Sequence, residues 1–120
     1  MLSLVIPIFN EEKLIDELVK RTISALESFI PDYEVIFVDD GSTDQSLNRI
    51  LYWQQKNRNI KVLSLSKNFG HQAAYTAGLE HAKGELVAMM DGDLQDPPEL
   101  LLEMYRKIQD EDLDIVSGKK

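Results

Sequence analysis

Short apolar runs alternate with amphipathic stretches along the whole chain, and this alternation most constrains the fold. Five runs are rich in apolar and β-branched residues, as expected for strands buried in a sheet: Leu2–Phe9, Tyr33–Val38, Ile60–Leu65, Leu86–Met90 and Leu113–Ser117. Four segments between them carry apolar residues at helical spacing or good helix formers. The resulting βαβαβαβαβ order predicts an α/β fold, in which a mostly parallel sheet has helices on both faces.

Local signals predict where the helices begin. Polar residues that can cap a helix stand before three of them: Asn10, Ser42 and Asp96. Glu11 and Glu12 would then lie in the first turn of the first helix, where the helix dipole favours negative charge. Gln45 has the spacing of a capping box with Ser42, and the third helix is predicted over residues 70–82.

The composition is that of one globular domain over residues 1–120 and excludes several classes of function. Thirteen basic and 21 acidic residues give a formal net charge of −8, which argues against a nucleic-acid surface and, at first sight, against phosphate ligands. There is no cysteine, so disulfides, thiolate nucleophiles and cysteine metal sites are excluded. No apolar run approaches the roughly 18 residues of a membrane-spanning helix.

Polar residues gather where the predicted strands end. Right-handed crossovers bring the carboxyl ends of parallel strands to one edge of the sheet, where such sheets bind ligands. Three polar clusters are predicted at this edge, namely residues 10–12, 39–44 and 91–96. The acidic stretch 110–114 precedes a strand instead, so we expect it at the opposite edge as a solvated loop.

Asp91 and Asp93 form the D-x-D pattern with the strongest indication of chemistry. They directly follow an apolar strand, and residues i and i+2 of an extended chain point the same way, so both carboxylates would converge at the binding edge. A divalent cation is the natural bridge between two adjacent carboxylates, and Gln95 can add a third oxygen ligand. Gly92 would let a ligand approach the backbone closely. The alternative is an ordinary turn in which Asp96 caps the next helix.

Other residues at this edge admit both a structural and a ligand-binding interpretation. Asp39 and Asp40 can be turn formers, or a carboxylate there can accept hydrogen bonds from a nucleobase N–H or a ribose hydroxyl. Lys67 lies in a turn after the third strand, at the binding edge. His71, near a helix start, is a candidate to approach a ligand, whereas His81 is expected at the surface. Glycine-rich phosphate loops, H-E-x-x-H and G-x-S-x-G are absent from the sequence.

Taken together, four segments resemble the family 2 glycosyltransferases with the GT-A fold. They are VIPIFNEE (5–12), VDDGSTD (38–44), SKNFGHQAAYTAGLEHAKGE (66–85) and MDGDLQDPPE (90–99). Within that family they are most similar to the polyprenyl-phosphate branch, which includes dolichol-phosphate mannose synthases and bactoprenol-phosphate glucosyltransferases. The resemblance implies that residues 1–120 are the Rossmann-like nucleotide-binding half of a GT-A domain, without the acceptor half and the membrane segments of such enzymes.

The resemblance also implies a set of binding residues. Those expected to contact the nucleotide or its diphosphate are Pro7, Phe9, Glu11, Asp39, Asp40, Lys67, Asp91, Gly92 and Asp93. The first three would line the base and ribose pocket, with Asp39 beside the base and Asp40 behind it. Asp91 and Asp93 would hold the diphosphate through Mg²⁺ or Mn²⁺, with Gln95 in the metal shell and Asp93 needed for catalysis.

Three positions depart from the pattern of that branch. Alanine is usual where Gly92 stands, and arginine is common where Lys67 stands, so the charge is kept but the forked donor geometry is lost. An arginine that follows the fifth strand in many members is matched here by Lys120, the final residue.

The implied reaction is a metal-assisted, inverting transfer of a sugar from a UDP- or GDP-linked donor to an acceptor, which in this branch is a polyprenyl phosphate. The metal acts as a Lewis acid on the departing diphosphate. A lipid phosphate is already an anion near neutral pH, so a strong general base is less necessary than for a hydroxyl acceptor. The resemblance places the longer enzyme at the cytoplasmic face of a membrane, in cell-wall or lipopolysaccharide biosynthesis, and leaves its sugar and oligomeric state open.

Two alternatives remain at this point. Phosphoacceptor receiver domains are also acidic (βα)₅ units with an aspartate pair, a third aspartate and a lysine, which Asp39, Asp40, Asp91 and Lys119 superficially match. In a receiver, however, the acidic pair follows the first strand and the acceptor aspartate the third. The chain can also be a nucleotide-sugar-binding fragment without turnover. The net charge is compatible with a diphosphate ligand, because an acidic edge recruits the divalent cation that carries one.

Overall fold

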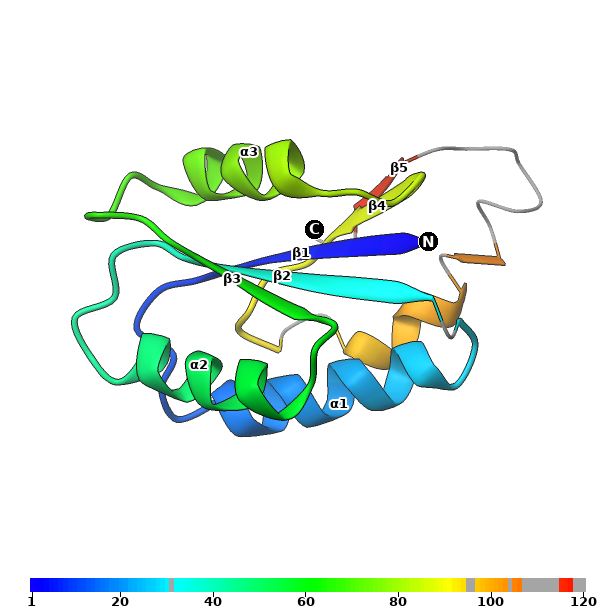
Figure 1. Cartoon of the computed structure of the whole chain (residues 1–120), viewed down its shortest axis with the longest axis horizontal. Helices are drawn as coiled ribbons and strands as arrows, with labels where there is room; N and C mark the ends of the chain where they lie inside the picture. Colours follow the sequence, from blue (N-terminus) through cyan, green and yellow to red (C-terminus); the bar gives the residue numbers. More distant parts are fainter. Residues whose placement is uncertain (31, 95–96, 104, 107–114, 118–120) are drawn as a thin grey trace.

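The structure is a computed structural model that describes residues 1–30, 32–94, 97–103, 105–106 and 115–117. Its elements follow the order β1 (Leu2–Ile8), α1 (Ile15–Glu27), β2 (Tyr33–Asp39), α2 (Ser46–Lys56), β3 (Ile60–Ser64), α3 (His71–His81), β4 (Leu86–Met89), a 3₁₀ helix η1 (Pro98–Leu100) and β5 (Ile115–Ser117). The strands form one sheet in the order β3-β2-β1-β4-β5, and every neighbouring pair is parallel (Figure 1). The predicted α/β class is confirmed.

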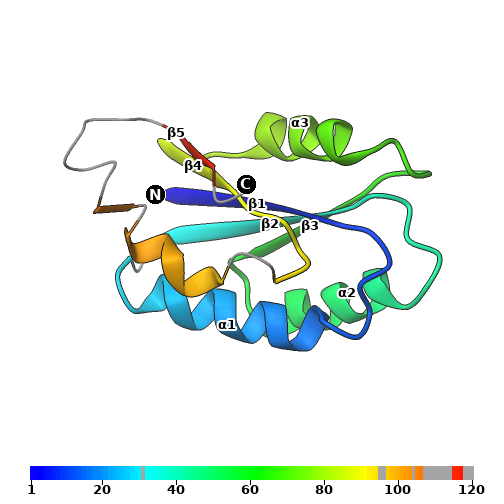
Figure 2. The same cartoon turned by 180° about the vertical axis from the view of Figure 1, so that it is seen from behind.

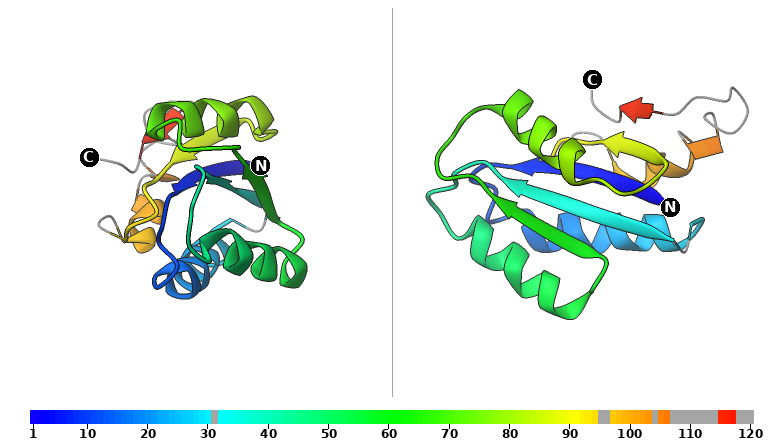
Figure 3. Two further views of the ribbon diagram at one scale, coloured as in Figure 1. Left: turned by 90° about the vertical axis from the view of Figure 1, so that its left-hand side faces the viewer. Right: turned by 45° about the horizontal axis from the view of Figure 1, so that its top comes forward.

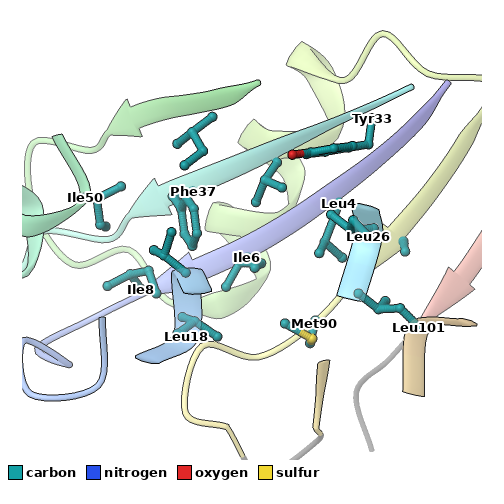
Figure 4. Close-up of a cluster of buried hydrophobic side chains, with 14 of the residues drawn as sticks. Leu4, Ile6, Ile8, Leu18, Leu26, Tyr33, Phe37, Ile50, Met90 and Leu101 are labelled. Carbon is teal, nitrogen blue, oxygen red and sulfur yellow. The ribbon is translucent and has the colours of Figure 1, made fainter. Parts of the chain in front are cut away.

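The sheet is covered on both faces. Helices α1 and α2 and the segment η1 lie against one face, and α3 lies against the other (Figure 3). Figure 2, from behind, shows η1 beside α1. The larger core fills the α1 and α2 side, where Ile6 and Ile8 of β1 meet Leu18 of α1 (Figure 4). Alternate residues of β1 point the other way, so Val5 belongs to the smaller core under α3.

Helix α3 approaches β1 closely because a glycine faces the strand. A Cβ atom added at Gly78 would lie 2.3 Å from Cγ1 of Val5, so no other side chain fits there without movement. Beyond α3, the buried Glu34 carboxylate fixes the chain before β4. Its Oε2 accepts hydrogen bonds from Ser3 Oγ (2.6 Å) and from the N–H of Lys83 (2.7 Å). These contacts hold α3 and β4 in place around the centre of the sheet.

The predicted starts of α1 and α2 are wrong. Helix α1 begins at Ile15, and Asn10 does not cap it, because Asn10 has a φ of 53° and its Oδ1 accepts from the N–H of Thr43 (2.8 Å). Helix α2 begins at Ser46, because Ser42 Oγ accepts from the N–H of Asn10 (3.0 Å) instead of capping a helix. The loops after β1 and β2 therefore hydrogen-bond to each other.

The C-terminal third is described only in part. Residues 101–103 and 105–106 are helical and continue η1. The predicted cap Asp96 and the predicted solvated loop 110–114 lie outside the described residues. No helix in the described part of the chain is long and apolar enough to cross a membrane.

Candidate functional site

The strand order places a crevice between the carboxyl ends of β1 and β4. Along the sheet, the strand that follows β1 lies on one side of this pair and the strand that follows β4 lies on the other, and parallel α/β sheets bind ligands where the strand order switches in this way. The N–H of Met90 donates to the carbonyl of Val5 (3.0 Å), which extends the pairing up to Asp91. A cavity of about 220 Å³ lies there, lined by Pro7, Phe9, Glu11, His71, Asp91, Gly92 and Asp93. Six of the residues predicted for the site thus share one cavity, and His71 joins them.

Asp91 is held in place from helix α3. Its side chain is buried, and Oδ1 accepts a hydrogen bond from the Tyr75 hydroxyl (2.9 Å). Sequence reasoning missed Tyr75, because its position in the middle of a helix gives no sign that it faces the end of β4. The half-buried Asp93 follows two residues later, before Leu94 turns the chain with a φ of 63°.

The pKa of Glu11 reflects the negative charge around the cavity. The pKa of its carboxyl is raised, first by burial and then by the negative charges of Asp93 and Asp44. Carboxylates from the loops after β1, β2 and β4 therefore repel one another at this edge. A bound cation would relieve that repulsion.

The residues present fit a divalent metal that is shared with a ligand. In the described part of the chain, no three His, Cys, Asp or Glu side chains are grouped to hold a metal by themselves, and Gln95 lies outside that part. Mg²⁺ is commonly held by one or two carboxylates together with substrate phosphates and water. Asp91 and Asp93, which line one cavity, supply such a pair.

Gly92 has a structural reason to be glycine. A Cβ atom at this position would lie 2.5 Å from Cδ1 of Ile8 and 2.8 Å from the carbonyl oxygen of Pro7. On the side where a side chain would stand, the space is therefore filled by β1. Gly92 also lines the cavity, and the close approach of a ligand to its backbone stays a prediction. Glycine lets the loop after β4 lie directly on β1.

Asp40 binds the backbone of a neighbouring loop. Its side chain is 1% exposed; Oδ1 accepts from the N–H of Phe69 (2.8 Å) and Oδ2 from the N–H of Gly70 (3.0 Å). The next residue, Gly41, has a φ of 73°, and a Cβ atom there would lie 2.3 Å from the carbonyl carbon of Lys67. Asp40 and Gly41 therefore fix the loop that follows β3, and Asp40 acts as a positioning residue.

Asp39 is also buried, but one of its oxygens is unpaired. Oδ2 accepts from the N–H of Ser42 (3.1 Å), whereas Oδ1 has no hydrogen-bond partner among the described residues. A buried acceptor without a partner is costly, and an N–H donor of a ligand could satisfy it. Strand alternation places Asp39 on the α1 and α2 side with Phe37, away from the cavity.

Lys67 lies at the same edge but outside the cavity. Its side chain is exposed, and its ammonium group lies 5.4 Å from the centre of the Phe69 ring. Asp39, Asp40 and Lys67 are thus close to the binding edge without lining the 220 Å³ cavity.

A parallel α/β sheet with a crevice at the carboxyl ends of its strands is the arrangement of many ligand-binding domains. The chain belongs to glycosyl transferase family 2, whose model matches residues 3–120. It is 42% identical over 105 residues to an uncharacterized glycosyltransferase, YkcC, of Bacillus subtilis, and this match covers 88% of the chain and 32% of the relative. It is also 42% identical over 118 residues to the dodecaprenyl-phosphate galacturonate synthase of Rhizobium johnstonii, covering 98% of the chain and 35% of the relative. The chain spans about a third of the curated relatives it matches.

Solved structures show the same fold. S. aureus TarS 1–349 in complex with UDP-GlcNAc matches with a TM-score of 0.74 and 32% identity, over 92% of this chain and 31% of that one. The mannosyltransferase PcManGT from Pyrobaculum calidifontis, in complex with GDP-Man and Mn²⁺, matches with a TM-score of 0.73 and 26% identity, over 84% of this chain and 30% of that one. The receiver-domain alternative is not supported, because flavodoxin-like receivers have the strand order 2-1-3-4-5.

Proposed function

We propose that residues 1–120 form the donor-binding part of a metal-dependent, inverting glycosyltransferase. The observation that carries this proposal is the shared cavity, in which Asp91 and Asp93 after β4 face Glu11 after β1. TarS and PcManGT, which have this fold, were solved with UDP-GlcNAc and with GDP-Man. The donor of this protein would accordingly be a UDP- or GDP-linked sugar.

The base and ribose would lie against Pro7, Phe9 and Glu11. Oδ1 of Asp39 lies outside the cavity and lacks a partner among the described residues, and it would accept a hydrogen bond from a ring N–H of a base that extends beyond the cavity along this edge. Asp40 would lie behind the base without contacting it, because both of its carboxylate oxygens accept hydrogen bonds from the backbone just before α3. That loop carries Lys67, whose ammonium group would approach the diphosphate.

Asp91, Asp93 and Gln95 would hold Mg²⁺ or Mn²⁺ together with the diphosphate oxygens. The bound metal would supply Lewis acidity toward the leaving diphosphate. Tyr75 would keep the Asp91 carboxylate oriented through its hydroxyl hydrogen bond. Asp93 would contribute most directly to turnover, because its half-buried carboxylate lines the cavity and is near enough to Glu11 to raise the pKa of that carboxyl.

The acceptor would be a polyprenyl phosphate. The name of the Rhizobium relative points to a dodecaprenyl-phosphate product, and the chain matches that relative over 98% of its own length. The groups that bind the lipid would then belong to the two-thirds of the relatives that this chain does not match. We place the longer protein at the cytoplasmic face of a membrane on the same grounds.

Nucleotide-dependent thermal stabilisation tests the proposal with the chain itself. UDP or GDP should raise the melting temperature only when Mn²⁺ or Mg²⁺ is present, by an amount that corresponds to about 2.7 kcal/mol at 100 times Kd. Asp93→Asn should abolish the shift. Asp32→Asn serves as the matched control, because Asp32 is an exposed carboxylate at the opposite edge of the sheet. No shift with either nucleotide would contradict the proposed pocket, and binding without sugar transfer to a polyprenyl phosphate would indicate a binding fragment.

A further inference from the structure

Charge is distributed very unevenly along this acidic chain. Residues 45–79 contain no aspartate or glutamate, although the chain has 21. Five of its 13 basic residues lie in this segment: Arg49, Lys56, Arg58, Lys61 and Lys67. The segment therefore has a formal charge of +5 and the rest of the chain −13.

Exposed apolar side chains gather in the same segment. Five large hydrophobic residues are exposed in the described part of the chain, and four of them belong to residues 45–79: Leu51, Tyr52, Phe69 and Leu79, at 38 to 53%. The absence of acidic residues and the exposure of apolar side chains are separate observations, and both single out this stretch. Exposed apolar groups that lie beside basic ones often mark an interaction surface.

The segment runs around the β3 edge of the sheet, with α2 on one face and α3 on the other. It forms α2, the edge strand β3 and α3, and Figure 1 shows α3 above β3 and α2 below it. A hollow of about 250 Å³ joins these elements, lined by Gln54 of α2, Lys61 of β3, His81 of α3 and the following Lys83, among others. The Glu34 carboxylate also borders this hollow, but it is buried and bonded to Ser3 and Lys83.

Cations and aromatic rings are paired on this surface. The centre of the Tyr52 ring lies 4.6 Å from the guanidinium carbon of Arg49 and 5.0 Å from the ammonium nitrogen of Lys56. Arg49 also forms an ion pair with Asp16 of α1 (2.8 Å). Lys56, Arg58 and Lys61 are exposed and form no ion pair with any other described residue. Their charge therefore faces solvent.

We propose that this surface, called here the basic face and made of Leu51, Tyr52, Lys56, Arg58 and Lys61, docks on an anionic lipid bilayer. Basic residues near such a bilayer each strengthen binding about fivefold, and Tyr and Leu side chains can enter the headgroup region. Nucleic acid would also match the charge and the ring, but it offers exposed leucine no apolar partner. The proposal stands apart from the proposed sugar transfer, since none of these five residues lines the nucleotide cavity.

Sedimentation with lipid vesicles tests the proposal. The chain should bind vesicles of phosphatidylcholine that contain phosphatidylglycerol, should not bind phosphatidylcholine alone, and should lose binding at high salt, where charges are screened. The pair Lys56→Gln and Lys61→Gln should lower the partition coefficient about 25-fold, at about fivefold for each charge. The matched pair Lys13→Gln and Arg106→Gln removes the same charge from exposed positions outside the face, and it should change binding less than about twofold.

The single tryptophan is a built-in reporter of the docked side. Trp53 is half-buried on α2, with its ring 5.4 Å from that of Tyr52. Vesicles with phosphatidylglycerol should protect it from acrylamide quenching, and the Lys56 and Lys61 variant should lose that protection while its urea unfolding midpoint stays unchanged. The proposal is overturned if anionic vesicles are not preferred, if the control pair weakens binding equally, or if a single-stranded oligonucleotide binds while vesicles do not.

Discussion

Asp40→Asn removes half of the clamp that holds the loop after β3. The two carboxylate oxygens of Asp40 accept from the N–H groups of Phe69 and Gly70, at 2.8 and 3.0 Å, in a site where the side chain is 1% exposed. Asparagine has the same shape but only one acceptor oxygen. Its amide group would therefore face an N–H donor with which it cannot bond.

The cost follows from these two hydrogen bonds. A hydrogen bond to a charged group contributes about 1.5–3 kcal/mol, and a neutral one about 1 kcal/mol. Losing one bond and weakening the other should lower the free energy of unfolding by about 3 kcal/mol. With an unfolding entropy of about 2.1 cal/mol/K per residue, the melting temperature of a domain of this size should fall by about 12 °C.

The neighbouring Asp39→Asn is the matched control. The Asp39 side chain accepts one hydrogen bond within the described residues, from the N–H of Ser42 (3.1 Å), and the remaining oxygen of asparagine can accept it after substitution. We expect a loss below about 1 kcal/mol in urea unfolding, together with weaker nucleotide binding. Faster amide exchange at Phe69 and Gly70 should appear in the Asp40 variant only. Equal melting temperatures for Asp40→Asn and the parent, or an equal loss in both variants, would refute the reasoning.

Two further changes test the crevice and the packing of α3. The pKa of Glu11 is raised, so the folded state binds a proton more tightly than the unfolded state, and stability should fall as pH rises from about 4.5 through the raised value. Glu11→Gln should remove this slope in urea titrations across that window, whereas a slope unchanged by the substitution would contradict the assigned cause. Gly78→Ala should cost about 1–3 kcal/mol through overpacking against Val5, and Val5→Ala in the same chain should recover part of it in a double-mutant cycle. No recovery would mean that the close approach does not set the cost.

The strands and their parallel arrangement were predictable because local hydrophobic patterns determine them. The starts of α1 and α2 were not, because contacts distant in sequence decide them. Asn10 would cap a helix in isolation, but its Oδ1 meets the N–H of Thr43, 33 residues away. Ser42 is drawn in the same way to the N–H of Asn10.

In the candidate site too, some features were predictable from the sequence and others were not. Residues at the carboxyl ends of β1 and β4 line one cavity, as expected because parallel sheets bind ligands at the carboxyl ends of their strands. The part played by Asp40 depends on two N–H groups from another loop, at sequence distances of 29 and 30. Tyr75 reaches Asp91 from a helix whose orientation only the packed structure fixes. Such contacts leave no pattern within a local window of sequence.

The central position of β1 has a consequence for the order of folding. β1 pairs with β2 from Leu2 opposite Tyr33, but with β4 from Leu2 opposite Leu86, so the second pairing closes a far longer stretch of chain. We expect contacts so distant in sequence to form late, since the entropy of closing the loop is lost before the contacts can stabilise the chain. The two walls of the crevice, residues 7–11 and 91–93, meet only when β4 has joined β1. A ligand bound between them would therefore stabilise the pairing of β4 with β1, and β4 amides would exchange more slowly in its presence.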